Sequence, residues 1–350
     1  MKKRCAVSTA LLSATFTVMF MLWFCAVACA QTIELKYASL WPPPPHPMSV
    51  ADTHWIEKIE KESNGKVKIK PFWMASLITP REGPLEVAKG VADIAYAPVG
   101  YMKAGFELAK AQEGFYQGSP DLETRIRIFW QVWDKFPEEK KEFSDYKLVV
   151  VGSSGEPSYH LMTTKPVRTL SDLKGLRIKA PLPMIEPLKQ LGAEGIIMSM
   201  AEVYEQMQKG IIQGAFAIPG DYKAMKFSEV VKYDITNITI DVNPAPFRIM
   251  ALSSWNKLPP DIQRLIDANK QWWSMEHAKE MQKATADGQE IAVKAGVQFI
   301  QVPQSDAAKF QEVFQKETIK HNRELDAKGI PATKYYEEIQ RLIREASKKK

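Results

Sequence analysis

Cysteine and histidine are scarce in this chain of 350 residues, and their scarcity excludes several kinds of chemistry. The three cysteines, Cys5, Cys25 and Cys29, all lie within the first 30 residues. Beyond residue 30 the chain can therefore form neither a disulfide nor a thiol nucleophile. No histidine belongs to an HExxH motif or to another closely spaced ligand pair, so we expect no metal site. The five histidines are His46, His54, His160, His277 and His321.

Motifs of catalysis are missing as well. No G-x-G-x-x-G occurs, and GSSG at residues 152–155 lacks both the G-x-S-x-G spacing and the Lys-Ser/Thr ending of a phosphate-binding loop. We expect this segment to be a surface loop. Carboxylates are numerous, but their spacing singles out no pair for acid–base catalysis. An enzyme therefore has no positive support, and we predict no catalytic residue and no cofactor.

Neither sign of charge dominates the chain. It has 47 Lys and Arg against 41 Asp and Glu, a formal net charge of +6. Residues 1–30 hold three basic residues and no acidic one, so the net charge without them is +3. A chain so close to neutrality has no electrostatic footprint for nucleic acid.

A long apolar run occurs only at the beginning. Lys2, Lys3 and Arg4 precede an apolar stretch that ends near Ala28, and Ala28-Cys29-Ala30 is an A-x-A cleavage signal. These features favour a cleaved secretory signal peptide over residues 1–30 and export to the periplasm. Two alternatives stay open: the run is long enough for a membrane anchor, and residues 26–29 roughly resemble the cleavage box of a lipoprotein. The mature chain has no other such run, and we expect it to be soluble.

The rest of the chain alternates between strand and helix patterns, which predicts an α/β fold with largely parallel strands. Its length and its 45% hydrophobic content allow two domains. We expect a boundary near Gly155 and a return crossing near Asn243-Pro244. The predicted strands cover 33–40, 66–73, 93–99, 146–154, 159–164, a segment after Gly210, and 247–254; the predicted helices cover 51–65, 80–92, 184–191, a segment from 201 and a long one over 261–296. Four consecutive prolines at 42–45 predict a rigid exposed loop.

One short strand carries two cations. In DLKGLRIKAP, residues 172–181, Arg177 and Lys179 alternate with Leu176, Ile178 and Ala180 and so share a face. Two cations on one face of a half-buried strand indicate either an anion-binding site or a solvated edge.

Three motifs in this order resemble one family. DLKGLRIKAP, then AEVYEQMQKGIIQGAF, then WNKLPPDIQRLI are similar to segments of the solute-binding proteins of TRAP transporters, the DctP type. The resemblance also includes LEVAKGVADIA, with Gly90 and Asp93, and it covers residues 31 to about 320. It implies a two-lobed periplasmic binding protein, a Venus flytrap, with a long bracing helix linking the lobes. Residues 31–156 plus about 244–285 would form lobe I, and residues 157–243 plus about 286–350 would form lobe II.

The resemblance also implies a function. The lobes would close around a small organic ligand and deliver it to two TRAP membrane subunits, without a cofactor, a metal or a nucleic acid, and as a monomer. Two alternatives remain. The same fold could present its ligand to a membrane receptor kinase as a sensor, or the protein could be a periplasmic enzyme.

The chain departs from the family's usual carboxylate clamp. Lys179 stands where most members have an arginine, and Arg177 stands at the usual lysine. Tyr159 occupies a second position that is often basic, and Gln213 replaces the usual aspartate. A lysine supplies a point charge but not the two-pronged grip of a guanidinium. The acid clamp is therefore weaker than in the family pattern.

Apolar residues are expected at the same place, although each is equally consistent with core packing. We predict a ligand with an apolar or aromatic body and one carboxylate, held by one lysine and a tyrosine hydroxyl. The predicted ligand-binding residues are Lys179, Tyr159, Trp41, Phe216, Met200 and Phe247.

Overall fold

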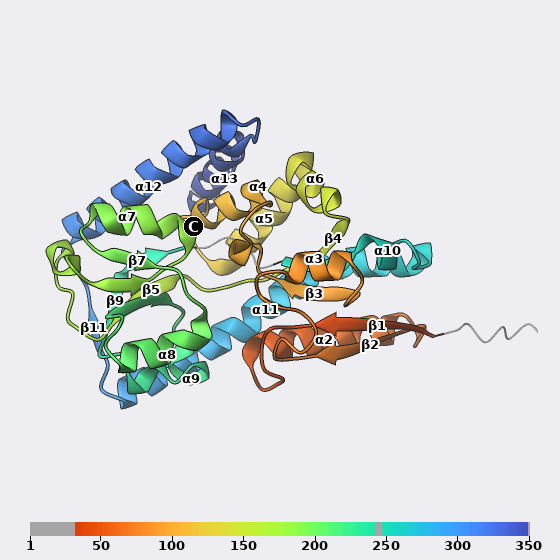
Figure 1. Cartoon of the computed structure of the whole chain (residues 1–350), viewed down its shortest axis with the longest axis horizontal. Coiled ribbons are helices and arrows are strands. Elements are labelled where there is room, and N and C mark those ends of the chain that lie inside the picture. Colours follow the sequence, from red (N-terminus) through yellow and green to blue (C-terminus); the bar gives the residue numbers. More distant parts are fainter. Residues whose placement is uncertain (1–31, 242–246, 349–350) are drawn as a thin grey trace, which may run out of the picture.

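A computed structural model describes residues 32–241 and 247–348. The predicted signal peptide and the predicted crossing at Asn243-Pro244 lie outside these residues. The structure contains two β-sheets, each covered by helices (Figure 1), and we call the part around the five-stranded sheet lobe I and the part around the six-stranded sheet lobe II. No helix in the described ranges is long and apolar enough to cross a membrane.

Lobe I is built on a mixed sheet with strand order β2-β1-β3-β10-β4. β1 pairs in parallel with β2 and β3, whereas β10 is antiparallel to β3 and β4. The strands are β1 (Ile33–Ala38), β2 (Val67–Phe72), β3 (Ile94–Ala97), β4 (Leu148–Ser153) and β10 (Phe247–Ala251).

Lobe II is built on the order β11-β9-β5-β8-β6-β7. β6 pairs in parallel with β7 and β8, and β5 runs antiparallel to β8 and β9. The strands are β5 (Tyr159–Thr163), β6 (Arg177–Lys179), β7 (Glu194–Ile196), β8 (Gly214–Ala217), β9 (Tyr233–Ile240) and β11 (Gln298–Ile300). The chain crosses from lobe I to lobe II before β5, returns to lobe I before β10, and crosses to lobe II again along α11 before β11.

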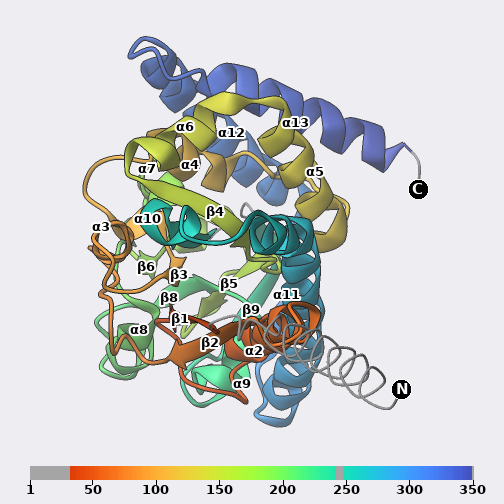
Figure 2. The same ribbon diagram turned by 90° about the vertical axis from the view of Figure 1, so that its right-hand side faces the viewer.

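One helix of 35 residues, α11 (Pro260–Lys294), joins both lobes. Figure 2 shows it running along one side of the molecule past α2 and α9. In lobe I, Trp273 of α11 stacks on Trp55 with ring centroids 3.8 Å apart. In lobe II, Gly288 lies so close to Pro219 that a Cβ would come within 2.0 Å of the proline's carbonyl oxygen. The predicted long helix is confirmed, with a proline in its first turn.

The other helices cover the two sheets. Around lobe I lie α2 (Pro47–Glu62), α3 (Gly83–Ala88), α4 (Glu107–Ala111), α5 (Leu122–Lys135), α6 (Pro137–Asp145), α10 (Leu252–Trp255) and α13 (Ala332–Ser347). Around lobe II lie α7 (Ile185–Gln190), α8 (Met200–Gln208), α9 (Asp221–Ala224) and α12 (Gln304–Asp326).

Two features differ from the expectations drawn from the sequence. α13 packs through Tyr335, Ile339 and Ile343 into the core that also holds α5, so it lies on lobe I rather than lobe II. GSSG at 152–155 is buried and not a surface loop. Its polar groups are satisfied internally, since Ser153 Oγ lies 2.8 Å from Ser274 Oγ and Ser154 bonds Arg248.

Candidate ligand-binding site

Lys179 stands at the carboxyl end of β6, where the strand pairs with Ile196 of β7 and Ala215 of β8. These pairings fix its position at the end of an inner strand of the lobe II sheet. Its side chain is only 7% exposed. Within the described residues its ammonium group has no hydrogen bond and no ion pair. Burial lowers the pKa of Lys179, and the negative charges of Asp221, Glu156 and Glu113 oppose this shift.

Arg177, on the same face of β6, has a different environment. It lies at the amino end of the strand, is partly exposed, and forms an ion pair with Glu194 of β7 at 3.2 Å. Its guanidinium also donates to the carbonyl of Ile211 at 2.9 Å. Of the two cations, only Lys179 is buried and without a partner in the described part of the chain.

Three carboxyl groups from different segments of the chain interact electrostatically with the ammonium group of Lys179. Glu113 comes from a 3-10 turn in lobe I, Gln112–Gly114, and Asp221 begins α9 in lobe II. Glu156 lies between β4 and β5, where the chain crosses between the lobes. Burial raises the pKa of Glu113 and of Asp221 to about 7, with Lys179 opposing the shift in each, and it raises the pKa of Glu156 as well.

Tyrosines stand among these charges. The Tyr159 hydroxyl donates to Glu156 Oε2 at 2.6 Å, and burial next to this carboxylate raises the pKa of the tyrosine. Burial raises the pKa of Tyr101 to about 12, with Glu113 and Glu156 adding to the shift. The buried Tyr96 also interacts with Glu156. Residues of both lobes thus meet around one group of ionisable side chains.

Trp41 lies in a small apolar cluster next to this group. It stacks on His46 with ring centroids 4.8 Å apart and meets Tyr96 edge-on at 5.9 Å. Ile218, which follows β8 in lobe II, packs against the same cluster. Because Ile218 also donates its backbone N–H to Asp221 at 3.3 Å, the apolar cluster and the carboxyl group adjoin.

The other predicted apolar residues lie elsewhere. Phe247 is fully buried in the lobe I core, 4.7 Å from Phe143 between ring centroids. Phe216 is fully buried in the lobe II core, with Phe310 at 6.1 Å. Met200 begins α8 and packs partly buried on a second lobe II cluster. The structure therefore brings Lys179, Tyr159 and Trp41 to one region, whereas the two phenylalanines occupy cores.

Arg248 supports the site from within lobe I. It is fully buried and donates to Asp52 Oδ1 through Nε at 3.1 Å and through a terminal nitrogen at 2.8 Å. Asp52 also accepts from Trp273 Nε1 at 3.1 Å. Since Arg248 contacts Ser154 and stabilises the charge of Glu156, this network holds the crossing segment next to the site.

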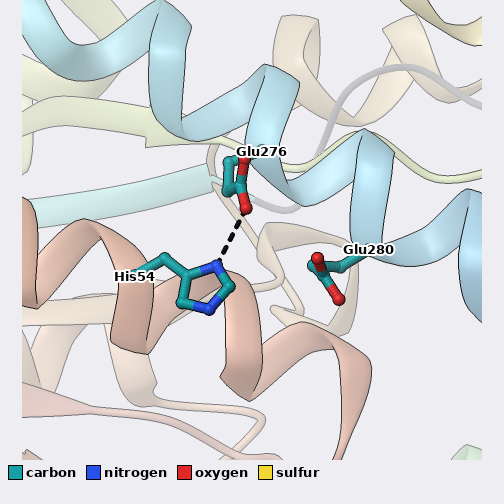
Figure 3. Close-up of side chains that lie close together, drawn as sticks. All are labelled: His54, Glu276 and Glu280. Atoms are coloured by element: carbon teal, nitrogen blue, oxygen red, sulfur yellow. Dashed lines mark hydrogen bonds and ion pairs between the residues drawn. The ribbon is translucent and has the colours of Figure 1, made fainter.

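A second group of possible metal ligands lies between α2 and α11 (Figure 3). His54 Nδ1 is 2.8 Å from Glu276 Oε1, Glu280 is one turn further along α11, and one ligand atom of each lies within 4.8 Å of the others. Both carboxylates already have lysine partners, Lys279 at 3.3 Å and Lys283 at 2.5 Å. Ion pairing along and between these helices accounts for the arrangement.

Sequence reasoning missed Glu113, Glu156, Asp221 and the tyrosines other than Tyr159. These residues are far apart in the chain and share no motif. The only local signal is the position of Glu156 and Asp221 directly after the ends of β4 and β8, because loops after strand ends carry ligands in open α/β sheets. Gln213, at the family's usual aspartate, accepts from the backbone of Arg177 at 3.0 Å and so shapes the entry to β8.

Comparison with known proteins adds to this geometry. Residues 38–324 match the family described as bacterial extracellular solute-binding protein, family 7. The uncharacterised protein YiiZ of Salmonella typhimurium is 28% identical over 221 residues, 61% of this chain. The match spans 64% of that relative, slightly less than two thirds of its length.

Solved structures share the fold along nearly their whole length. A TRAP solute-binding protein from Rhodoferax ferrireducens T118, in complex with copurified benzoate, has 22% identity and a TM-score of 0.78, over 91% of this chain and 99% of that one. One from Bordetella bronchiseptica with bound mandelate has 18% identity and a TM-score of 0.75, over 90% and 99%. One from Chromohalobacter salexigens with bound D-glucuronate has 18% identity and a TM-score of 0.73, over 88% and 99%. At these identities the likeness establishes the two-lobed fold.

Proposed function

The chain belongs to the bacterial extracellular solute-binding proteins of family 7, the DctP type, and from this premise we propose that it captures a small organic acid in the periplasm and delivers it to TRAP membrane subunits. The observation that supports an acidic ligand is the environment of Lys179, which is a buried cation without a partner among the described residues. A buried charge is costly unless it is paired, so a ligand carboxylate at this point stabilises both groups.

The body of the ligand is proposed to be apolar or aromatic, with a single carboxylate. Trp41 and Tyr96 supply aromatic surface from lobe I, and Tyr159 supplies a hydroxyl from lobe II. A lysine gives one point charge without the two-pronged grip of an arginine, so the apolar body would supply a larger share of the binding free energy. The ligands of the solved relatives, benzoate and mandelate among them, support this class, whereas D-glucuronate represents the polar alternative.

Ligand capture follows from the position of these residues on two lobes. A ligand that contacts Trp41 in lobe I and Lys179 in lobe II interacts more strongly with the closed arrangement than with an open one. Binding energy then shifts the population to the closed form, which the membrane subunits would recognise. No covalent chemistry is needed.

Thermal-shift screening with benzoate, mandelate and D-glucuronate tests the ligand class. A ligand at 100 times its dissociation constant adds about 2.7 kcal/mol to the free energy of unfolding, which raises the melting temperature measurably. We expect the aromatic monoacids to stabilise. Strong stabilisation by sugar acids or dicarboxylates, with none by aromatic monoacids, would refute the apolar assignment.

Lys179→Ala tests the carboxylate contact, and Arg177→Ala is the matched control from the same strand face. We expect the first variant to lose at least tenfold in affinity for a bound acid, about 1.4 kcal/mol, by isothermal titration. The control should bind like wild type, because Arg177 points to Glu194 instead. Equal affinities of all three proteins would place Lys179 outside the binding site.

A further inference from the structure

An imidazole and two carboxylates converge between α2 and α11 (Figure 3), and they share no residue with the group around Lys179. His54 Nδ1 lies 2.8 Å from Glu276 Oε1, and one ligand atom of each residue, Glu280 included, lies within 4.8 Å of the others. The imidazole distinguishes this group from the purely acidic clusters that occur on many protein surfaces. Imidazole and carboxylate are ligands with which proteins bind divalent transition metals such as Zn²⁺.

The two carboxylates lie on one face of α11. Glu276 and Glu280 are four residues apart, so their side chains project from the helix one turn above the other. His54 faces them from α2. Both glutamate side chains are only 11% exposed, whereas the His54 side chain is 41% exposed. A metal ion can therefore enter from solvent at the imidazole and reach two carboxylates that are largely shielded from water.

The helices that carry these ligands are held firmly together. Trp55 follows His54 in α2 and stacks on Trp273 of α11, with ring centroids 3.8 Å apart. Trp273 Nε1 also donates to Asp52 Oδ1 of α2 at 3.1 Å. His54 and Glu276 lie within three residues of these contacts, so the packing fixes the backbones on both sides of the group. Ligands that are positioned in advance lose little conformational entropy on binding.

The ion pairs that arrange the carboxylates leave most of their capacity to bind a metal unused. Lys279 lies 3.3 Å from both oxygens of Glu276, and Lys283 donates to Glu280 Oε1 at 2.5 Å. In the described part of the chain no hydrogen bond reaches Glu280 Oε2. The two lysine side chains are 59% and 60% exposed. Such exposed pairs contribute at most about 1 kcal/mol, so a divalent ion displaces the lysines into solvent at small cost.

The spacing of the ligand atoms is compatible with one ion. Two ligands bound to the same tetrahedral Zn²⁺ at about 2.0–2.1 Å are about 3.3 Å apart from each other. The pair His54–Glu276, at 2.8 Å, then has to open by about half an ångström. The flexible side chain of Glu280 closes the larger gap by rotation about its own bonds. Three protein ligands leave the fourth position to water.

We propose that His54, Glu276 and Glu280 form a binding site for Zn²⁺ or a similar divalent transition metal, which ties α2 to α11. This site goes beyond the proposed function and does not depend on it. The sequence suggested no metal site because it was searched for closely spaced ligands, whereas His54 and Glu276 are 222 residues apart. A bound ion would stabilise the part of α11 that lies in lobe I.

Isothermal titration with ZnCl₂ tests the proposal. The mature protein, without a histidine tag, is first treated with a chelator and dialysed. We expect one Zn²⁺ per chain and a rise of the melting temperature in the presence of the metal. Mg²⁺ at the same concentration should neither bind measurably nor stabilise, because it prefers oxygen ligands and retains its water.

Three variants assign the ligands. His54→Ala, Glu276→Gln and Glu280→Gln should each weaken Zn²⁺ binding at least tenfold, while circular dichroism in the presence of chelator shows that the variants are folded. The matched control is His321→Ala. His321 is an exposed histidine 3.7 Å from Glu324 on its own helix, and its removal should leave Zn²⁺ affinity unchanged.

A gain of affinity provides a test that a misfolded variant cannot imitate. Glu280→His adds a second imidazole to the site and should tighten Zn²⁺ binding at least tenfold. Absence of Zn²⁺ binding to the wild-type protein at millimolar concentration would overturn the proposal. Binding that is equally strong in all three loss variants, or that is lost in His321→Ala, would overturn it as well, because the metal would then be held elsewhere.

Discussion

Two cations on one strand face show how the position along a strand determines whether a charged side chain is solvated or buried. Arg177 and Lys179 have the same orientation on β6, but the first lies at the amino end next to Glu194 and the second at the carboxyl end between the lobes. Arg177 is solvated and paired within its own sheet. Lys179 is buried among groups from three other segments, and only this difference makes it a candidate for binding.

Three acids whose pKa is raised by burial should make the stability of the ligand-free protein depend on pH. Burial raises the pKa of Glu113 and Asp221 to about 7 and that of Glu139 to about 8. The folded state then keeps protons that the unfolded state has released, so the free energy of unfolding falls as pH rises from about 4.5 through 8. We expect thermal denaturation between pH 6.5 and 8.5 to show a falling melting temperature, by several degrees.

Glu139→Gln should flatten that dependence and stabilise the protein at pH 8.5 by about 2 kcal/mol. Glu139 is fully buried, its carboxyl oxygens lack a well-formed hydrogen bond among the described residues, and the nearby Gln112 side chain opposes the rise of its pKa only in part. Glu345→Gln, at an exposed carboxylate, is the control that should change little. A curve of stability against pH for Glu139→Gln that runs parallel to the wild-type curve would contradict the argument.

The buried His277 has the opposite effect on stability below pH 6.5. Burial lowers its pKa, so the free energy of unfolding falls as the pH falls in that range.

The candidate site could be predicted from the sequence only where a motif marks it. Lys179 and Tyr159 were chosen from family positions, and in the structure both interact with Glu156, whereas their contact with a ligand stays a prediction. Glu113 and Asp221 could not be found, because 108 residues and a lobe boundary separate them and only folding brings their charges near one lysine. Phe216 and Phe247 show the converse, since an aromatic residue next to a strand end does not reveal which side of the sheet it faces.

At the scale of elements, the segment between β4 and β5 is closely packed against two helices. Gly155 passes between α5 and α11, and a Cβ there would lie 2.6 Å from Ile126 Cδ1 and 2.9 Å from Ala278 Cβ. His277 Nδ1 lies 3.2 Å from the Gly155 backbone. These contacts hold the first crossing segment against both helices.

Gly155→Ala should therefore cost about 3 kcal/mol of stability through overpacking. Gly65→Ala is the control: its φ of +74° costs about 1 kcal/mol, but no atom lies within 4 Å of the added Cβ. Urea denaturation measures both. Equal losses for the two variants would mean that the passage at Gly155 opens without difficulty.

Most strands and the long helix could be predicted because alternation, glycines and prolines mark them locally. The direction of β5 and β10 could not, because it depends on how the chain crosses between sheets. The packing of α13 shows the same limit, since its apolar face around Tyr335 and Ile339 does not specify a partner. The helices between residues 107 and 145 were not predicted, and the burial of Ser153 and Ser154 depends on partners 94 or more residues away.

At the scale of the whole molecule, one arginine links two of the segments at which the chain crosses between the lobes. Arg125 of α5 donates to the carbonyl of Glu156 at 3.1 Å, on the first crossing. It also donates to Asp241 at 2.9 Å, directly after β9, where the chain leaves lobe II. Asp241 further accepts from the backbone N–H of Gly118 at 2.9 Å, so a lobe I loop is attached to the end of a lobe II strand.

This arrangement predicts that Asp241 controls the relative orientation of the lobes. Asp241→Ala removes the acceptor of Arg125, of the Gly118 backbone N–H and of the Ser158 hydroxyl, and it leaves the buried Arg125 without this carboxylate. The orientation that brings Lys179 towards Glu113 would then be less populated, and the apparent dissociation constant rises by the inverse of the remaining fraction. We expect about a tenfold weaker affinity and a larger radius of gyration by small-angle X-ray scattering, with the radius of the ligand-saturated protein unchanged.

The control is Asp287→Ala, which breaks an exposed ion pair with Lys223 at 2.6 Å and should alter neither the affinity nor the radius. An Asp241→Ala protein that folds and retains both the wild-type affinity and the wild-type radius would show that the crossings themselves, and not this attachment, set the position of the lobes.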